Sequence, residues 1–173
     1  MSQHKILNIA QQEFLRLEDI KNYLRISHDY DDIWLLELIN SAIEASENFL
    51  RKHIIARTIE SKFYTITNYS LELPFSPVFH IDRVVTSYAG QNIICSPENY
   101  ILNDQLLKFQ KLSRFEYITV IHKSGYEDQS LIPAAIKQGI MLHVAQMYDS
   151  HGTSSAISAE VGKLYQPYRK MRV

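Results

Sequence analysis

The sequence predicts one α+β domain, a helical bundle of two N-terminal helices and one C-terminal helix with an inserted, mainly antiparallel β region. Apolar residues recur at helical spacing near both ends of the chain, whereas β-branched and aromatic residues dominate the middle. The connections between the candidate strands are too short for the crossovers that parallel strands need. The expected boundaries are a helical frame at about 17–56 and 131–151, a β-rich insert at about 57–126 and a flexible C-terminal tail at 152–173.

The first two helices follow from apolar spacing and acidic starts. Leu17 and Ile20 begin a short helix over about 17–25, and acids in its first turn suit the positive end of a helix. After a polar break, a broad apolar stripe predicts a long helix that begins near Asp31 or Asp32. The stripe comprises Leu35, Ile39, Ala42, Ser46, Phe49 and His53. A stripe this broad favours packing against other helices and a neighbouring subunit.

The β-rich middle and the last helix are bounded by proline, glycine and other turn residues. Strands are expected at about 58–67, 71–73, 81–88 and 117–122. Pro133 stands where proline is tolerated, in the first turn of a helix that ends near Ser150 and Gly152.

Composition and charge exclude several classes of protein. The chain has 173 residues, 46% hydrophobic and 21% charged, which suits one core and a globular fold. A net charge of -1 lacks the strong basic field of most dedicated nucleic-acid binders. A single cysteine, Cys95, fits a reducing compartment, and neither an export signal nor a membrane span is expected.

No candidate residue forms a persuasive catalytic, metal or cofactor site. Asp29, Asp31 and Asp32 lack the glycine and glutamate of a calcium loop, so helix capping explains them better. His143 and His151 are too far apart for a helical zinc pair, and His143 is expected to be a half-buried packing residue.

Nucleophilic and nucleotide chemistry also lack their usual markers. Cys95 has no adjacent base and is expected to be a core thiol. The 5 glycines are too scattered for a phosphate loop. The sequence therefore predicts no cofactor and no enzyme.

Charge is distributed unevenly along the chain. Residues 13–52 carry nine acids and five bases, a difference of -4, which disfavours a phosphate-binding helix pair. The C-terminal tail carries four bases and one acid, a difference of +3, interleaved with Tyr165 and Tyr168. That tail suits either a solubilising segment or an interface anchor, since aromatic residues and arginine are enriched at interfaces.

Several short motifs occur in an order that resembles the head-to-tail connector (adaptor, DNA-packaging) proteins of tailed bacteriophages, prophages and gene-transfer particles. These are the segments 17–26, 35–50, 73–78, 99–100, 124–126, 132–138 and 167–169. Each motif is short and mostly structural, so the order carries the specificity. The resemblance spans about residues 17–169.

The resemblance implies a structural subunit of a homo-oligomeric ring, commonly of about twelve subunits, beneath the portal protein. The ring links the DNA-filled capsid to a tail or stopper protein, and packaged DNA traverses its lumen without sequence readout. Assembly in the host cytoplasm and a final place at the head-tail junction of the virion are implied. The alternatives are a non-catalytic nucleic-acid-binding module that uses the basic tail, or an unrecognised enzyme.

The resemblance also assigns roles to two groups of residues. The core and subunit interface is expected at Trp34, Leu38, Phe49 and Leu50. The portal-binding tail, expected to become ordered on docking, is represented by Tyr165, Tyr168, Arg169 and Arg172.

Overall fold

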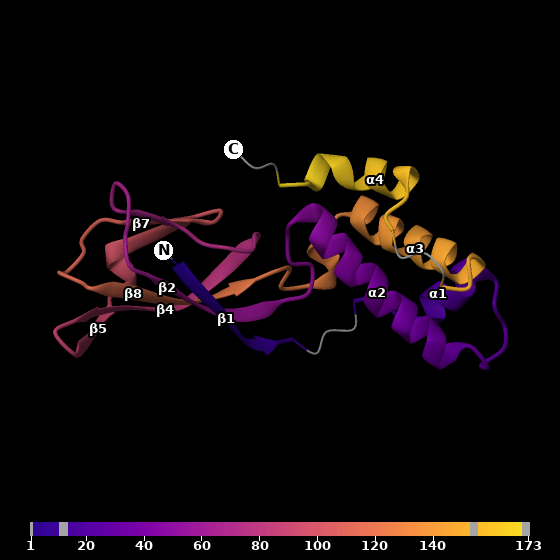
Figure 1. Ribbon diagram of the computed structural model, residues 1–173, viewed down its shortest axis with the longest axis horizontal. Coiled ribbons are helices and arrows are strands. Elements are labelled where there is room, and N and C mark those ends of the chain that lie inside the picture. The colour runs from indigo at the N-terminus through magenta and orange to yellow at the C-terminus, as the bar shows by residue number, and fades with distance from the viewer. Residues whose placement is uncertain (1, 11–13, 153–155, 171–173) are drawn as a thin grey trace. The chain divides into compact units, whose positions relative to one another are not determined.

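A computed structural model describes residues 2–10, 14–152 and 156–170, which form two compact units (Figure 1). One, the β unit, comprises residues 1–12 and 55–127; the other, the helical unit, comprises residues 13–54 and 128–173. The predicted α+β class with an inserted antiparallel region is confirmed. The assignment of the whole chain to a single connector domain stays a prediction.

The helical unit contains the three predicted helices and a fourth. They are α1 (Leu17–Leu24), α2 (Asp32–Leu50), α3 (Ala134–Asp149) and α4 (Ala159–Tyr165), with 3-10 turns at Gln129–Leu131 and Gln166–Tyr168. Helices α1 and α2 end at Arg25 and Arg51, which adopt the left-handed conformation typical of a helix C-terminus. Pro133 immediately precedes α3, as its N-cap. Helix α3 packs against both α2 and α4.

The acids before α2 form side-chain contacts other than the expected caps. Asp31 is the N-cap residue but makes no side-chain cap hydrogen bond, and its carboxylate instead accepts from the Tyr148 hydroxyl at 2.7 Å. The Lys21 ammonium donates to Asp29 at 2.5 Å and to Asp32 at 2.7 Å. Asp31 therefore stands at the predicted capping position, but its side chain does not cap the helix, because it bonds to a phenolic partner from another helix instead.

The flexible-tail prediction for 152–173 is wrong for residues 159–168, which form α4 and a 3-10 turn. Ser158 begins α4 by accepting a hydrogen bond from the Val161 backbone N–H at 3.3 Å, a common way to satisfy a helix N-terminus. Val161 and Tyr165 lie on one side of the helix and are both buried. Packing, rather than a bound partner, therefore orders this segment.

The β unit contains two antiparallel sheets, and the described residues include strands beyond the four expected. The five-stranded sheet has the order β1 (Ser2–Ile9), β2 (Arg57–Phe63), β8 (Tyr117–Ser124), β4 (Val78–Tyr88) and β5 (Gln91–Cys95). The three-stranded sheet has the order β3 (Ser70–Glu72), β7 (Leu106–Phe109) and β6 (Tyr100–Asn103), with a 3-10 turn at Pro97–Asn99 before β6. Strand β1 was not predicted, because every residue of this edge strand is exposed and none marks a core-facing side.

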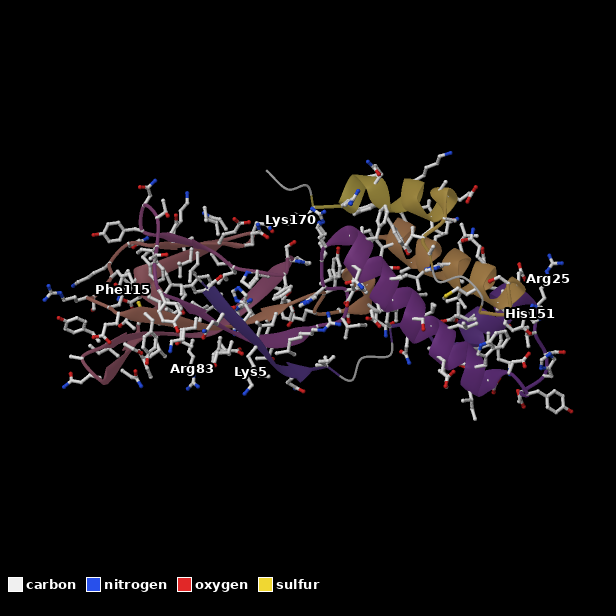
Figure 2. All side chains as sticks on the ribbon, in the orientation of Figure 1. Lys5, Arg25, Arg83, Phe115, His151 and Lys170 are labelled. Atoms are coloured by element: carbon white, nitrogen blue, oxygen red, sulfur yellow. The ribbon has the colours of Figure 1, made fainter. Side chains whose placement is uncertain are left out.

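Alternate residues of the central strands form the core of the β unit. Ile118 and Val120 of β8 point to one side and pack with Leu107 and Phe109 of the smaller sheet. His122, two residues further along β8, lies on the same side of the strand and is 0% exposed. The opposite face carries charged side chains: Lys5 and Arg83 lie in the same row across the larger sheet, and Figure 2 shows both directed to one side.

Candidate functional site

The C-terminal segment is held on the helical unit by the buried side chain of Tyr165, which is 0% exposed. Its hydroxyl lies 2.7 Å from Ser46 Oγ on α2. Ser46 Oγ donates its own hydrogen to the Ala42 carbonyl at 2.6 Å, so Tyr165 is the donor in the bond between the two hydroxyls. Burial raises the pKa of Tyr165 to about 12, which keeps this donor protonated.

The Tyr165 ring lies directly on the backbone of α3, at a glycine. A Cβ atom added to Gly139 would stand 2.2 Å from Cε1 and 2.8 Å from Cζ of Tyr165. Glycine in a helix interior costs about 1 kcal/mol relative to alanine, so its presence here has a packing reason. Because Gly139 has no side chain, the Tyr165 ring can lie against the backbone of α3 at this position.

The residues after Tyr165 continue the attachment along the end of α2. The Arg169 guanidinium carbon lies 4.9 Å from the centroid of the Phe49 ring, within the range of a cation–π contact. The Phe49 and Tyr165 ring centroids are 5.9 Å apart. The Lys170 backbone N–H donates to the Leu50 carbonyl at 3.0 Å, near the end of the described chain, where Figure 2 labels Lys170. We call residues 159–170 the clamp segment.

Trp34 belongs to a separate aromatic contact at the other end of α2. Its ring centroid lies 5.1 Å from that of Tyr148 on α3. The hydrogen bond from the Tyr148 hydroxyl to Asp31 is the main reason that the pKa of Tyr148 is raised. This contact joins the start of α2 to the end of α3 within one subunit.

The structure brings together only part of the predicted site. Phe49, Leu50, Tyr165 and Arg169 meet at the clamp segment, whereas Trp34 and Leu38 lie earlier on α2. Leu38 and Leu50 are buried, and Trp34, Phe49 and Tyr168 are half-buried. Arg172 lies outside the described residues.

Sequence reasoning did not predict the contacts that three residues make here, although it placed one of them, Ser46, on the apolar stripe of the second helix. They are Ser46, Gly139 and Tyr148. Gly139 carried a detectable signal, because a glycine inside an apolar helical pattern commonly marks a close approach. Ser46 and Tyr148 carried none, since their partners lie more than a hundred residues away along the chain or on another helix.

The residues considered as a possible nucleophile or metal ligand, Cys95 and His143, lack the surroundings that those roles require. Burial raises the pKa of the Cys95 thiol, which opposes thiolate formation at neutral pH. His143 is 1% exposed, so the expectation of a half-buried residue is corrected to a fully buried one on the core side of α3. Among residues 2–10, 14–152 and 156–170, no three His, Cys, Asp or Glu side chains are grouped to hold a metal ion.

Two open hollows lie in the β unit. One of about 240 Å³ is lined by Asn8, Ala10, Ala56, Arg57, Thr58, Phe79, Lys123 and Glu127. The other, of about 560 Å³, is lined by Ile66, Asn68, Tyr69, Leu112, Ser113, Arg114 and Phe115. Neither lining pairs a serine or cysteine nucleophile with a histidine base.

The described helices do not meet the requirements of a membrane span. None of them is both long enough and apolar enough to cross a bilayer.

Solved structures with a similar fold come from the neck and the virion of gene transfer agent particles. The neck of an empty gene transfer agent (GTA) particle, computed with C6 symmetry, contains a chain with a TM-score of 0.80 and 18% identity; the match covers 99% of this chain and 97% of that one. A chain in the virion of the native GTA particle has a TM-score of 0.78 and 19% identity over 98% of this chain and 96% of that one. The neck of the native particle, computed with C12 symmetry, contains a chain with a TM-score of 0.66 and 17% identity. That match covers 96% of this chain and 97% of that one.

Sequence comparison points the same way at the level of the family. No curated protein matches the chain. Residues 14–169, which include the four α-helices and strands β2 to β8 of the described part of the chain, match the family described as phage gp6-like head-tail connector protein. This match confirms the resemblance that the order of the short motifs suggested. The chain belongs to the phage gp6-like head-tail connector family.

Proposed function

We propose that the chain is an adaptor subunit that assembles into a ring under the portal vertex and links the DNA-filled capsid to the tail or stopper. The family match over residues 14–169 carries this proposal. The fold shared with neck chains of particles computed with C6 and C12 symmetry supports a cyclic arrangement. The protein acts by assembly and without a chemical reaction, in the host cytoplasm first and then in the particle.

The proposed subunit interface includes apolar side chains of α2 that remain at least partly exposed in the isolated subunit. Trp34 and Phe49 are half-buried in the isolated subunit, and Ile33 and Leu36 are 78% and 46% exposed on the same helix. A ring needs two different surfaces on each subunit, and burial of these apolar side chains by a neighbour would supply one of them. Leu38 and Leu50 support this surface from the core.

The clamp segment is the proposed portal contact. Arg169 is exposed and Tyr168 half-buried, so both are available while α4 is in place; Arg172 follows them in the chain. Tyr165 is buried and serves as the anchor that presents them. Arginine and tyrosine are frequent among residues that dominate binding energies at protein interfaces.

Packaged DNA is proposed to pass through the ring lumen without sequence readout. Residues 13–52 have a net charge of -4, from nine acids and five bases, and this negative charge disfavours tight binding of phosphates by α1 and α2. A wall of that kind would let DNA slide.

Mixing the purified protein with its cognate portal and imaging the product by electron microscopy tests the proposal. We expect rings on the portal with the wild-type chain, and we expect Arg169→Glu to weaken portal binding by about tenfold or more. Lys163→Glu makes the same charge change at an exposed position of α4 and should bind within about twofold of wild type. Failure of the wild-type chain to form a ring or bind the portal would reject the connector function.

A further inference from the structure

The larger sheet of the β unit has two free edges, formed by β1 and β5. No strand in the described residues pairs with the outer side of either one. Free edges present unpaired N–H and C=O groups, and proteins usually protect them with charges, bulges or proline. The two edges of this sheet differ in that protection.

Strand β1 carries features that oppose pairing between two copies of β1, where like charges would meet, but not pairing with β5, which has no charged side chain. Lys5 places a charge on β1, and the register with β2 shifts between Ile6 and Asn8. The five residues of β5 include no charged side chain and no proline. Ile93 and Ile94 are 50% and 71% exposed there. An uncharged edge with exposed isoleucines favours pairing with another strand.

The turn before β5 determines which backbone groups face outward. Ala89 and Gly90 have φ values of 48° and 76°, as in the two-residue turn of type I′, and Tyr88 pairs with Gln91 across it. The residues that flank such a turn exchange hydrogen bonds, and the pattern alternates along an antiparallel ladder. Asn92 and Ile94 therefore direct their N–H and C=O groups away from β4.

We propose that the β5 edge of one subunit pairs with the β1 edge of the next subunit in the ring. This inference rests on the proposed ring. A cyclic assembly joins two different surfaces of the same chain, and the two edges of one sheet meet that need. Strand β1 also presents Ile6, Leu7 and Ile9, each about half exposed, which the isoleucines of β5 can cover.

Proline at position 94 provides a direct test, because it removes an outward N–H and leaves the pairing with β4 intact. We expect Ile94→Pro to reduce the assembled fraction by about tenfold or more. Ile94→Thr keeps the N–H, and it should assemble within about threefold of wild type. Both variants should unfold at a denaturant concentration close to that of the wild-type subunit.

The outcomes separate this inference from the connector function. If the wild-type chain forms portal-bound rings and Ile94→Pro forms them equally well, edge pairing is wrong and the connector function stands. If the wild-type chain forms no ring, the connector function itself fails. Loss of assembly with Ile94→Thr as well as Ile94→Pro would assign the effect to the side chain and overturn backbone pairing.

Cross-linking identifies the strand that covers β5 even if the proline variant folds poorly. Ile94→Cys is combined with one cysteine at a time along Ser2–Ile9, in a chain in which Cys95→Ala removes the native thiol. We expect oxidation of assembled rings to give a ladder of head-to-tail oligomers at one or two of these positions, where the Cα atoms come within disulfide range. Ile94→Cys paired with Ser41→Cys on α2 is the control.

Two results of the cross-linking would overturn the inference. Rings that give no ladder at any β1 position exclude β1 as the partner of β5. Disulfide-linked dimers formed by Ile94→Cys alone, without any β1 cysteine, would show that two β5 edges pair with each other.

Discussion

Replacing Gly139 with alanine is expected to destabilise the helical unit by about 2 kcal/mol, although alanine normally favours a helix by about 1 kcal/mol over glycine. The new Cβ would stand 2.2 Å from the Tyr165 ring, and the hydrogen bond to Ser46 prevents the ring from moving aside freely. The clamp segment should therefore loosen. Denaturant unfolding followed by the fluorescence of Trp34, the chain's one tryptophan, measures the change in the helical unit.

Gly162→Ala is the matched control, because it adds the same methyl group to a helix of the same unit. Its Cβ would meet Phe49 at 3.6 Å, an ordinary contact, so the free energy of unfolding should stay equal or rise by up to about 1 kcal/mol. In a Tyr165→Ala background the penalty of Gly139→Ala should disappear, since the clashing ring is gone. A Gly139→Ala protein as stable as wild type would contradict the assigned contact.

Acidification is expected to destabilise the β unit through His122 by about 3 kcal/mol at most. Burial lowers the pKa of His122 from 6.5 to about 4 in the folded chain. Between these values the unfolded chain takes up a proton that the folded chain excludes. The contribution of His122 to stability is therefore complete above pH 6.5, falls as the pH drops, and is lost once the pH is below about 4. Partial desolvation of the exposed His4 ring on β1, which lies near Phe63 and Phe75, also lowers the pKa of His4 and adds a loss of the same sign.

His122→Leu isolates this effect, because leucine suits the buried site and does not titrate. Far-UV circular dichroism of urea unfolding at several pH values, together with hydrogen exchange of the β8 amides, should show a smaller loss of stability between pH 6.5 and 4. His80→Gln changes an exposed histidine of the neighbouring strand β4 and should preserve the wild-type dependence. An unchanged pH profile in His122→Leu would refute the role of His122.

The predictable parts of the fold were those whose residues alternate between core and solvent. Helix α2 buries Leu35, Ile39 and Ala42 at helical spacing, so its start followed from the sequence within a residue. Its end did not, because the predicted stripe continued to His53, whereas the helix ends at Leu50. Strand β1 buries nothing, and three of the five residues of β5 give no strand signal. Helix α4 is only seven residues long and buries two side chains, too few for a recognisable period.

The candidate site shows a different limit of sequence reasoning. The pattern selected Phe49, Tyr165 and Arg169 because aromatic residues and arginine are typical of interfaces. The structure brings all three together within one subunit. The residue type of a side chain can predict that it packs against another surface. It cannot predict whether that surface belongs to the same chain or to another, because burial stabilises both contacts in the same way.

The path of the chain between its two units has a further consequence. Residues 55–127 of the β unit are inserted into the helical unit and residues 1–12 precede it, so the backbone passes between the units three times, after residues 12, 54 and 127. One proteolytic cut at any single crossing leaves the units covalently joined by the other two. Limited proteolysis should therefore yield nicked chains that still migrate as one particle in a native gel and separate only when denatured, and a deletion that frees either unit must close or replace more than one connection.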